Sequence, residues 1–185
     1  GEWTLLPDAP LSTIYLGLPD SVRGVVLARI DRLPEGHKVT LKVASTIGHI
    51  FEFEVLHQSH PLQPEATTIH EQLGLLESHN FTIVEIPGVL LSYIFKHTII
   101  QEVAYETLLE SQQQALHLAV GMSLQRLRPE AVEQLAYHFS RGGQREQALH
   151  YLDLAARKAQ RAYANETALA YYTRALALEE RWQWR

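Results

Sequence analysis

The sequence predicts a mainly α-helical fold that carries one small β-hairpin and ends in helical repeats. Apolar residues recur at the three- and four-residue spacing of helices through most of the 185 residues. The spacing changes to strict alternation only between residues 81 and 95. From residue 129 onward, small and bulky apolar residues follow a helical-repeat pattern of about 34 residues.

Residues 1–19 are predicted to form a linker or the edge of a preceding domain. Pro7, Pro10, Gly17 and Pro19 interrupt any regular run there. The chain begins with Gly rather than Met, and two tryptophans follow its last helical pattern. We therefore expect it to be a piece of a longer protein.

Three helices are predicted between residues 20 and 78. The first has an N-cap at Asp20 or Ser21 and ends at Pro34, and the second ends at Gly48, a residue typical of helix C-termini. An apolar cluster at residues 51–56 and two prolines follow. The third helix is expected over residues 65–78, with its apolar face at three- and four-residue spacing.

Residues 81–95 predict a β-hairpin. One strand alternates apolar and polar residues, Pro87-Gly88 forms the turn, and Leu91, Tyr93 and Phe95 share one face of the returning strand. Three helices followed by a hairpin is the order of a winged-helix unit, which we place at residues 20–97.

Residues 98–185 are predicted to be helical throughout and to contain repeats like those of tetratricopeptide (TPR) proteins. Two apolar helix faces come first, one formed by Ile99, Ile100, Val103 and Ala104, the other by Ala115, Leu118, Ala119 and Met122. The repeat frame then places bulky and small residues where stacked helices need them: Val132, Leu135, Ala136, Phe139, Ala148, Leu152 and Ala155. Gly142-Gly143 forms the turn inside the repeat. A second unit is expected to share one long helix with the first.

Composition leaves little room for catalysis. The chain has no Cys, no P-loop motif and no Gly-x-Ser-x-Gly motif, so we expect no catalytic residue and no enzyme activity of its own. His57 and His60 could begin a zinc site, but no third ligand completes a known spacing, so no metal is expected. No apolar run approaches the ~20 residues of a membrane span and no signal peptide is seen, which favours a cytoplasmic protein.

The distribution of charge bears on whether the chain binds DNA or protein. A winged helix can be the DNA-binding piece of a transcriptional regulator, with its third helix in the major groove. Between Lys42 and Lys96, however, the chain has no Lys or Arg and has six Glu residues. Phosphate backbones require basic side chains, so binding to protein is favoured over binding to nucleic acid, and DNA binding is the alternative.

Several stretches together resemble one family. They are residues 18–34 (LPDSVRGVVLARIDRLP), 44–48 (ASTIG) and 95–105 (FKHTIIQEVAY), followed by helices rich in Ala and Tyr. The chain resembles the segment after the P-loop core in signal-transduction ATPases of the STAND class, especially bacterial predicted ATPases associated with adenylate or guanylate cyclase domains. The resemblance implies a winged helix that docks on an ATPase core holding ADP or ATP, and repeats that bind a protein partner.

The resemblance also singles out His97. In similar apoptotic and plant-resistance ATPases, a Met-His-Asp motif follows the wing, and its His reaches the β-phosphate of the nucleotide. Lys96-His97-Thr98 stands at the corresponding place, with Thr98 instead of the Asp. The resemblance therefore implies that His97 senses nucleotide in the parent protein. The alternative is that His97 only caps the helix that starts beside it.

Overall fold

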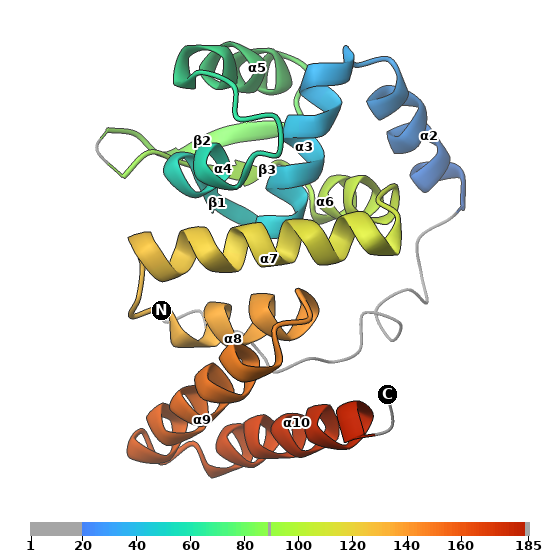
Figure 1. Ribbon diagram of the computed structural model, residues 1–185. Coiled ribbons are helices and arrows are strands. Elements are labelled where there is room, and N and C mark those ends of the chain that lie inside the picture. Colours follow the sequence, from blue (N-terminus) through green and yellow to red (C-terminus); the bar gives the residue numbers. More distant parts are fainter. Residues whose placement is uncertain (1–19, 89, 184–185) are drawn as a thin grey trace.

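The computed structural model describes residues 20–88 and 90–183 (Figure 1). The predicted linker over residues 1–19 lies outside this range. The described chain is mainly helical, with one small three-stranded antiparallel sheet, as the sequence predicts at this coarser level. None of its helices is both long enough and apolar enough to cross a lipid bilayer.

Between residue 20 and the hairpin, the structure describes four helices. They are α2 (Asp20–Asp31), α3 (Glu35–Ile47), α4 (Phe53–Ser59) and α5 (Ala66–Ser78). The three predicted helices agree with α2, α3 and α5, and α3 ends at its predicted C-cap, Gly48. The prediction missed α4, because its seven residues are too few to show a helical period.

The sheet also contains one strand more than predicted. Strands β2 (Thr82–Ile86) and β3 (Ser92–Phe95) form the expected hairpin, and β1 (Ile50–Glu52) pairs with the other side of β3. Phe51 lies opposite Tyr93 and Thr82 lies opposite Phe95, so these side chains share the face that packs on the helices. Three residues are too short a strand for alternation to reveal.

We call the apolar cluster around this sheet the first core. Phe51, Phe81 and Phe95 are each 1% exposed and meet buried side chains of α2, α3 and α5. Helix α6 (Thr98–Glu106) adds Ile100 and Val103 to the same cluster. The predicted boundary after residue 97 stays a prediction, and the first core continues past it.

The rest of the chain forms a stack of helices. They are α7 (Glu110–Leu127), α8 (Val132–Arg141), α9 (Arg145–Arg161) and α10 (Asn165–Gln183). In Figure 1, α7 lies between the sheet-containing unit above it and α8, α9 and α10 below it. Consecutive helices pack on one another, and α7 also contacts α3 and α4. Helix α7 therefore belongs to both parts of the molecule.

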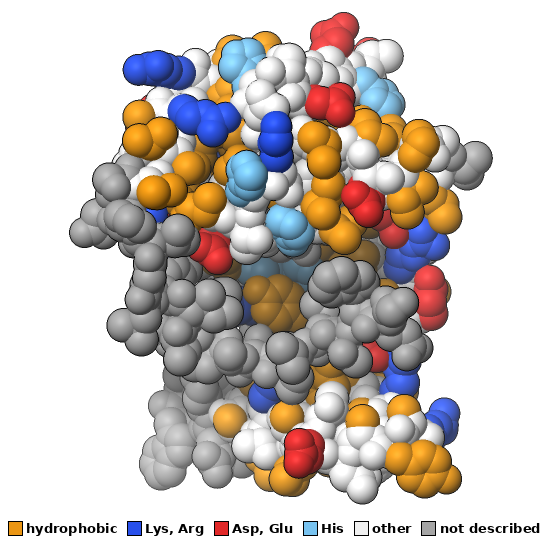
Figure 2. All heavy atoms as spheres, turned by 180° about the vertical axis from the view of Figure 1, so that it is seen from behind, with side chains coloured by type: hydrophobic (Ala, Val, Ile, Leu, Met, Phe, Trp, Pro, Cys, Tyr) orange, Lys and Arg blue, Asp and Glu red, His pale blue; other side chains and the backbone are white. Residues whose placement is uncertain are grey.

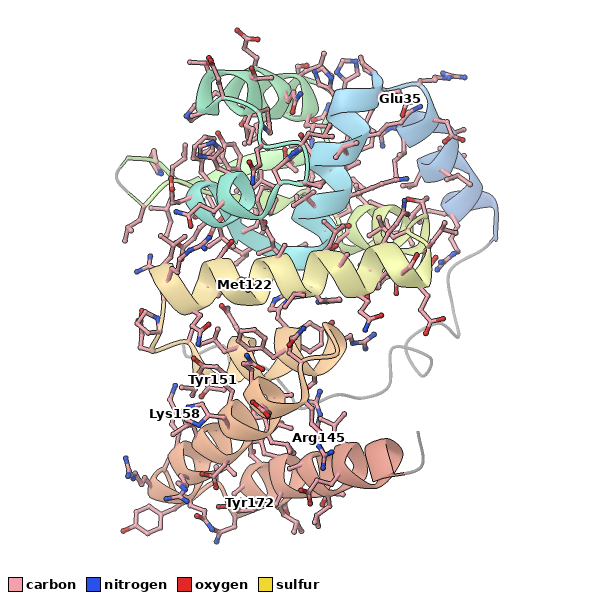
Figure 3. All side chains as sticks on the ribbon, in the orientation of Figure 1. Glu35, Met122, Arg145, Tyr151, Lys158 and Tyr172 are labelled. Carbon is pink, nitrogen blue, oxygen red and sulfur yellow. The ribbon has the colours of Figure 1, made fainter. Side chains whose placement is uncertain are left out.

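We call the cluster under α7 the second core. Six of the seven repeat positions predicted from the sequence are buried, and only Val132 is partly exposed. Tyr151, labelled in Figure 3, stacks on Phe139 with ring centroids 5.5 Å apart, and Gln125 of α7 donates a hydrogen bond to its hydroxyl at 3.0 Å. The second core therefore includes the underside of α7.

Two predictions in this region are wrong. The expected apolar face of α7 is not the buried one: Met122 is 49% exposed, whereas Leu116, His117 and Val120 are buried. The shared long helix is instead two helices, because α9 ends at Arg161 and α10 begins at Asn165. Tyr163, between them, has a left-handed φ of 58° that a continuous helix does not allow.

Candidate functional site

The structure places His97 at the junction between β3 and α6, where the sequence analysis expected it. Its backbone is extended, with φ −143° and ψ 137°, and its carbonyl accepts a hydrogen bond from the Ile100 amide at 3.0 Å. The imidazole is exposed and makes no capping hydrogen bond. His97 therefore occupies the N-cap position with its backbone alone, and its side chain is directed to solvent.

The two histidines weighed as zinc ligands are held by other parts of the protein. His57 Nε2 lies 3.2 Å from the Pro64 carbonyl oxygen. His60 is buried, with Nε2 3.2 Å from the Thr40 hydroxyl and Nδ1 accepting from the Leu62 amide. In the described residues, no three His, Cys, Asp or Glu side chains are grouped as metal ligands.

A pocket that sequence reasoning did not predict opens between α7, the α8–α9 turn and α10. Its volume is about 500 Å³. Its polar wall includes Tyr105, Gln114, His117 and Arg141, and Leu178 of α10 is apolar. Arg145, labelled in Figure 3, lies between α9 and α10 with its guanidinium 3.8 Å from the Glu179 carboxylate.

A buried chain of hydrogen bonds begins at this pocket. The Tyr105 hydroxyl lies 2.9 Å from His117 Nε2, and His117 Nδ1 lies 3.0 Å from His138 Nδ1. The His138 ring also hydrogen-bonds to the Ile47 backbone, and because this bond raises the His138 pKa, its partner is the carbonyl oxygen. One chain of polar groups thus joins α3, α6, α7 and α8.

The direction of each proton follows from the last acceptor. A carbonyl only accepts, so neutral His138 carries its proton on the nitrogen that faces Ile47 and must accept at Nδ1. His117 then donates from Nδ1 and accepts the Tyr105 proton at Nε2. Every buried nitrogen of His117 and His138 therefore has a partner, as a buried polar chain requires.

Both histidines are neutral at physiological pH. Burial, and next the nearby His138, lower the pKa of His117 to about 3. Burial also lowers the pKa of His138 to about 4, although its bond to Ile47 acts in the opposite direction. The positive charge of Arg141 lowers both values further.

Arg141 is held at the edge of this chain. Burial raises the Tyr105 pKa, and the charge and hydrogen bonding of Arg141 beside the hydroxyl partly oppose that rise. The Arg141 guanidinium also lies 5.4 Å from the centre of the Tyr137 ring. Among the side chains that the structure describes, no carboxylate forms an ion pair with Arg141, unlike Arg128 and Arg157.

Glycines explain how α8 comes so close to α7. A Cβ on Gly142 would lie 2.9 Å from the Leu118 backbone nitrogen, and Gly143 has a left-handed φ of 73°. A Cβ on Gly121 would lie 3.2 Å from the Phe139 ring. The sequence signal for this site was thus the Gly142-Gly143 turn together with the two histidines, His117 and His138.

Helix α5 bears on the alternative of DNA binding. Its exposed side chains include Glu71 and Glu77, and its own sequence has no Lys or Arg. The structure does bring Arg29 and Lys96 to its C-terminal end, where they hydrogen-bond to His79 and Asn80. On the face in Figure 2, basic side chains are interspersed with acidic and hydrophobic ones.

The described elements and this pocket define a mainly helical protein with a small antiparallel sheet and a buried polar chain between its two cores. No protein-family model, curated protein or solved structure matches the chain. Its family and function therefore have to be inferred from its own residues.

Proposed function

We propose that this chain is a non-catalytic regulatory and scaffold module of a STAND-class signalling ATPase. A winged-helix unit would respond to ATP or ADP in the P-loop core of the parent protein, and TPR-like helices would bind a protein partner. The observation that carries the proposal is the buried chain from Tyr105 through His117 and His138 to Ile47. It links the two parts that such a module has to couple.

The arrangement of the first part supports a winged helix. Helices α2, α3 and α5 are followed by the hairpin of β2 and β3, and short β1 completes a three-stranded sheet. His97 directly follows this hairpin with its imidazole exposed. An exposed imidazole at this place can contact a group on another domain. In the parent protein, that group would be a phosphate of the bound nucleotide.

The second part supports repeat-like packing. Helices α8 and α9 pack together and are joined by the Gly142-Gly143 turn, and buried Ala136 and Ala148 belong to the cluster that they share. Small residues allow helices to stack closely, which is the way helical repeats build a continuous core. This similarity favours a protein-binding scaffold.

The buried chain favours coupling rather than independent movement. If α8 shifted away from α7, the hydrogen bond between His117 and His138 would break, and the buried nitrogen of His138 would lose its partner. Leaving such a group unsatisfied costs about 1–3 kcal/mol. Intermediate positions are therefore disfavoured, and a shift of α8 would also disturb Tyr105 on α6 and Ile47 on α3.

Hydrogen exchange on the full 185-residue chain tests the coupling. We expect His138→Phe to accelerate amide exchange in α3 and α6 as well as in α8, because it removes the hydrogen bonds of the imidazole while keeping an aromatic ring in its place. Leu152→Val, which trims the second core away from the chain, is the matched control and should affect only α7–α10. Acceleration confined to α7 and α8 in the His138 variant would reject the coupling.

Nucleic-acid binding is the second candidate, and an electrophoretic mobility assay at low salt tests it. The Glu residues on the exposed face of α5 lead us to expect no shift of duplex DNA at micromolar protein. A shift at micromolar concentration or tighter would favour the transcription-factor reading over the scaffold.

Calorimetry with ADP tests whether the nucleotide binds to the P-loop core of the parent protein rather than to this chain. The chain has no P-loop motif, so we expect no measurable ADP affinity in the 185-residue chain alone. In the parent protein, His97→Ala should speed ADP release while leaving the fold of this segment unchanged. Tight ADP binding to the isolated chain, or unchanged release in the parent variant, would contradict the role given to His97.

A further inference from the structure

We propose that the pocket between α7, the α8–α9 turn and α10 binds a small monocarboxylate whose anionic group pairs with Arg141. The site lies outside the His97 junction. The inference deepens the proposed function by naming the chemistry of a signal, and it rests on that function only for its regulatory meaning. The binding itself stands on the geometry of the pocket.

Arg141 is the group prepared for an anion. Its guanidinium is held between the Tyr105 hydroxyl and the face of the Tyr137 ring, so little side-chain freedom remains to be lost on binding. Among the described residues, the other pocket guanidinium, that of Arg174, already has an interaction of its own. Arg141 has a cation–π contact and a hydroxyl beside it, and none of the carboxylates that the structure describes pairs with it.

The other lining residues select the kind of anion. Glu110 also lines the pocket, and its charge would oppose a phosphate dianion. A carboxylate has one negative charge and two oxygens that match a guanidinium. The pocket therefore favours a monoanion over a phosphate.

The remaining walls define the body of the ligand. Ala177 and Leu178 of α10 offer apolar surface, and Gln114 offers an amide beside the Gly143 turn. The volume of about 500 Å³ is within the range of small-molecule sites. We infer a carboxylic acid with a compact apolar body.

Binding would act on the buried chain through Arg141. A carboxylate that draws the guanidinium toward itself removes a positive charge and a hydrogen-bond donor from beside Tyr105. The Tyr105 hydroxyl is the first donor of the hydrogen-bond chain that ends at Ile47. A ligand in the pocket would therefore change the stability of the hydrogen bonds in α3. This gives the pocket a route to the first core.

Ligand-observed NMR with benzoate as the probe tests the site on the full chain. We expect saturable binding in the millimolar range, at least about 10-fold weaker in Arg141→Gln because a charge-assisted pair is lost. Arg157→Gln is the matched control, since Arg157 is an exposed residue of α9 that pairs with Asp153. Circular dichroism of both variants checks that the helices are intact.

Inorganic phosphate is the second probe. Phosphate should bind more weakly than benzoate to the wild-type chain. Glu110→Gln removes a negative charge and should raise the affinity for phosphate, so that the difference between the two affinities becomes smaller. No saturable benzoate binding, equal affinity in Arg141→Gln, or tighter binding of phosphate than of benzoate would each overturn the proposal.

Hydrogen exchange with and without benzoate separates this proposal from the coupling of the two cores. If benzoate binding depends on Arg141 but leaves amide exchange in α3 unchanged, the binding site is supported and its proposed effect on the first core is rejected. The coupling proposal fails instead when His138→Phe, without any ligand, leaves α3 and α6 unaffected.

Discussion

The two cores of this molecule are built on different principles. The first core is filled by large rings, with Phe51 and Phe95 packed at a centroid distance of 5.5 Å. The second core has one such pair of rings, Phe139 and Tyr151, and in addition two small residues, Ala136 and Ala148, that are almost fully buried. Burial of large side chains therefore stabilises both cores, and the second core requires in addition a close approach of its helix backbones.

The boundary between the cores differs from both. There the buried groups are polar, and His117 and His138 are each 2% exposed or less. Apolar packing tolerates small sliding movements, whereas a hydrogen-bond chain holds only in one geometry. We therefore expect the stability of the first core to fall most when side-chain volume is removed, and that of the second core when volume is added. The stability of the boundary should depend on pH.

The largest expected effect is a truncation in the first core. Phe95 is 1% exposed and contacts the Phe51 ring, so Phe95→Ala removes a ring that nothing nearby can replace. We expect the free energy of unfolding to fall by about 3–5 kcal/mol. Urea denaturation followed by circular dichroism measures this loss.

Tyr163→Ala is the control for that truncation, because the Tyr163 ring is 91% exposed. It should change the unfolding free energy by no more than about 0.5 kcal/mol. A Phe95 variant as stable as the Tyr163 variant would show that the rings of the first core do not stabilise it as argued.

The next effect is a dependence of stability on pH at the boundary. The unfolded chain binds protons on histidine near the ordinary pKa of 6.5, whereas folded His117 and His138 do so only near 3 and 4. Their contribution is therefore complete above pH 6.5 and is lost as the pH falls from 6.5 toward 4. Between pH 7 and pH 5 the loss is roughly 2 kcal/mol for each histidine.

Urea midpoints measured across this pH range test the sign and the origin of the effect. The double variant His117→Gln/His138→Gln should be less stable than the wild-type chain at pH 7. Its free energy of unfolding should also change less between pH 7 and pH 5. A smaller slope should remain, since burial also lowers the pKa of His49 and His60. An unchanged slope in the double variant would mean that other groups cause it.

The sequence predicted the parts of the fold that have a local signal. Capping residues and helical periodicity located α2, α3 and α5, and Pro87-Gly88 located the hairpin. Strand β1 and helix α4 were missed because each is too short for a period to emerge. Local pattern therefore identified the long elements and not the short ones between them.

The pocket was missed for another reason. His117 and His138 are 21 residues apart, and neither stands at a recognisable motif spacing. A polar residue on a helix ordinarily predicts an exposed face, so α7 was assigned the wrong buried side. Only the tertiary approach of α7 and α8, permitted by Gly121 and Gly142, makes burial of these imidazoles possible. The position of His97 at a strand-to-helix junction was predictable because such a junction is a local feature, and the nucleotide-sensing role of His97 stays a prediction.

Adding one methyl group should sharpen the contrast between the two parts. Gly121 on α7 faces the Phe139 ring, and its new Cβ would lie 3.2 Å from it, so Gly121→Ala should destabilise the chain by about 1 kcal/mol. Gly74 on α5 has nothing within 4 Å of such a Cβ, and Gly74→Ala should stabilise it by up to ~1 kcal/mol through helix propensity. Thermal unfolding should therefore give melting temperatures that shift in opposite directions in the two variants, and shifts of the same sign would contradict the contrast.

The smallest effect concerns the ion pair that joins the parts at the other end of α7. Arg128 donates to both oxygens of Glu52 on β1, at 3.0 to 3.2 Å, with both side chains about one-third exposed. Solvent screens such a pair, so Arg128→Gln should cost no more than about 1 kcal/mol, and less in high salt. Arg157→Gln, which breaks a pair within α9, should cost less still, because Arg157 and Asp153 already lie on one helix. If the two variants were equal at low salt, the bridge between the parts would add nothing beyond local charge pairing, and the buried histidine chain would be their main polar link.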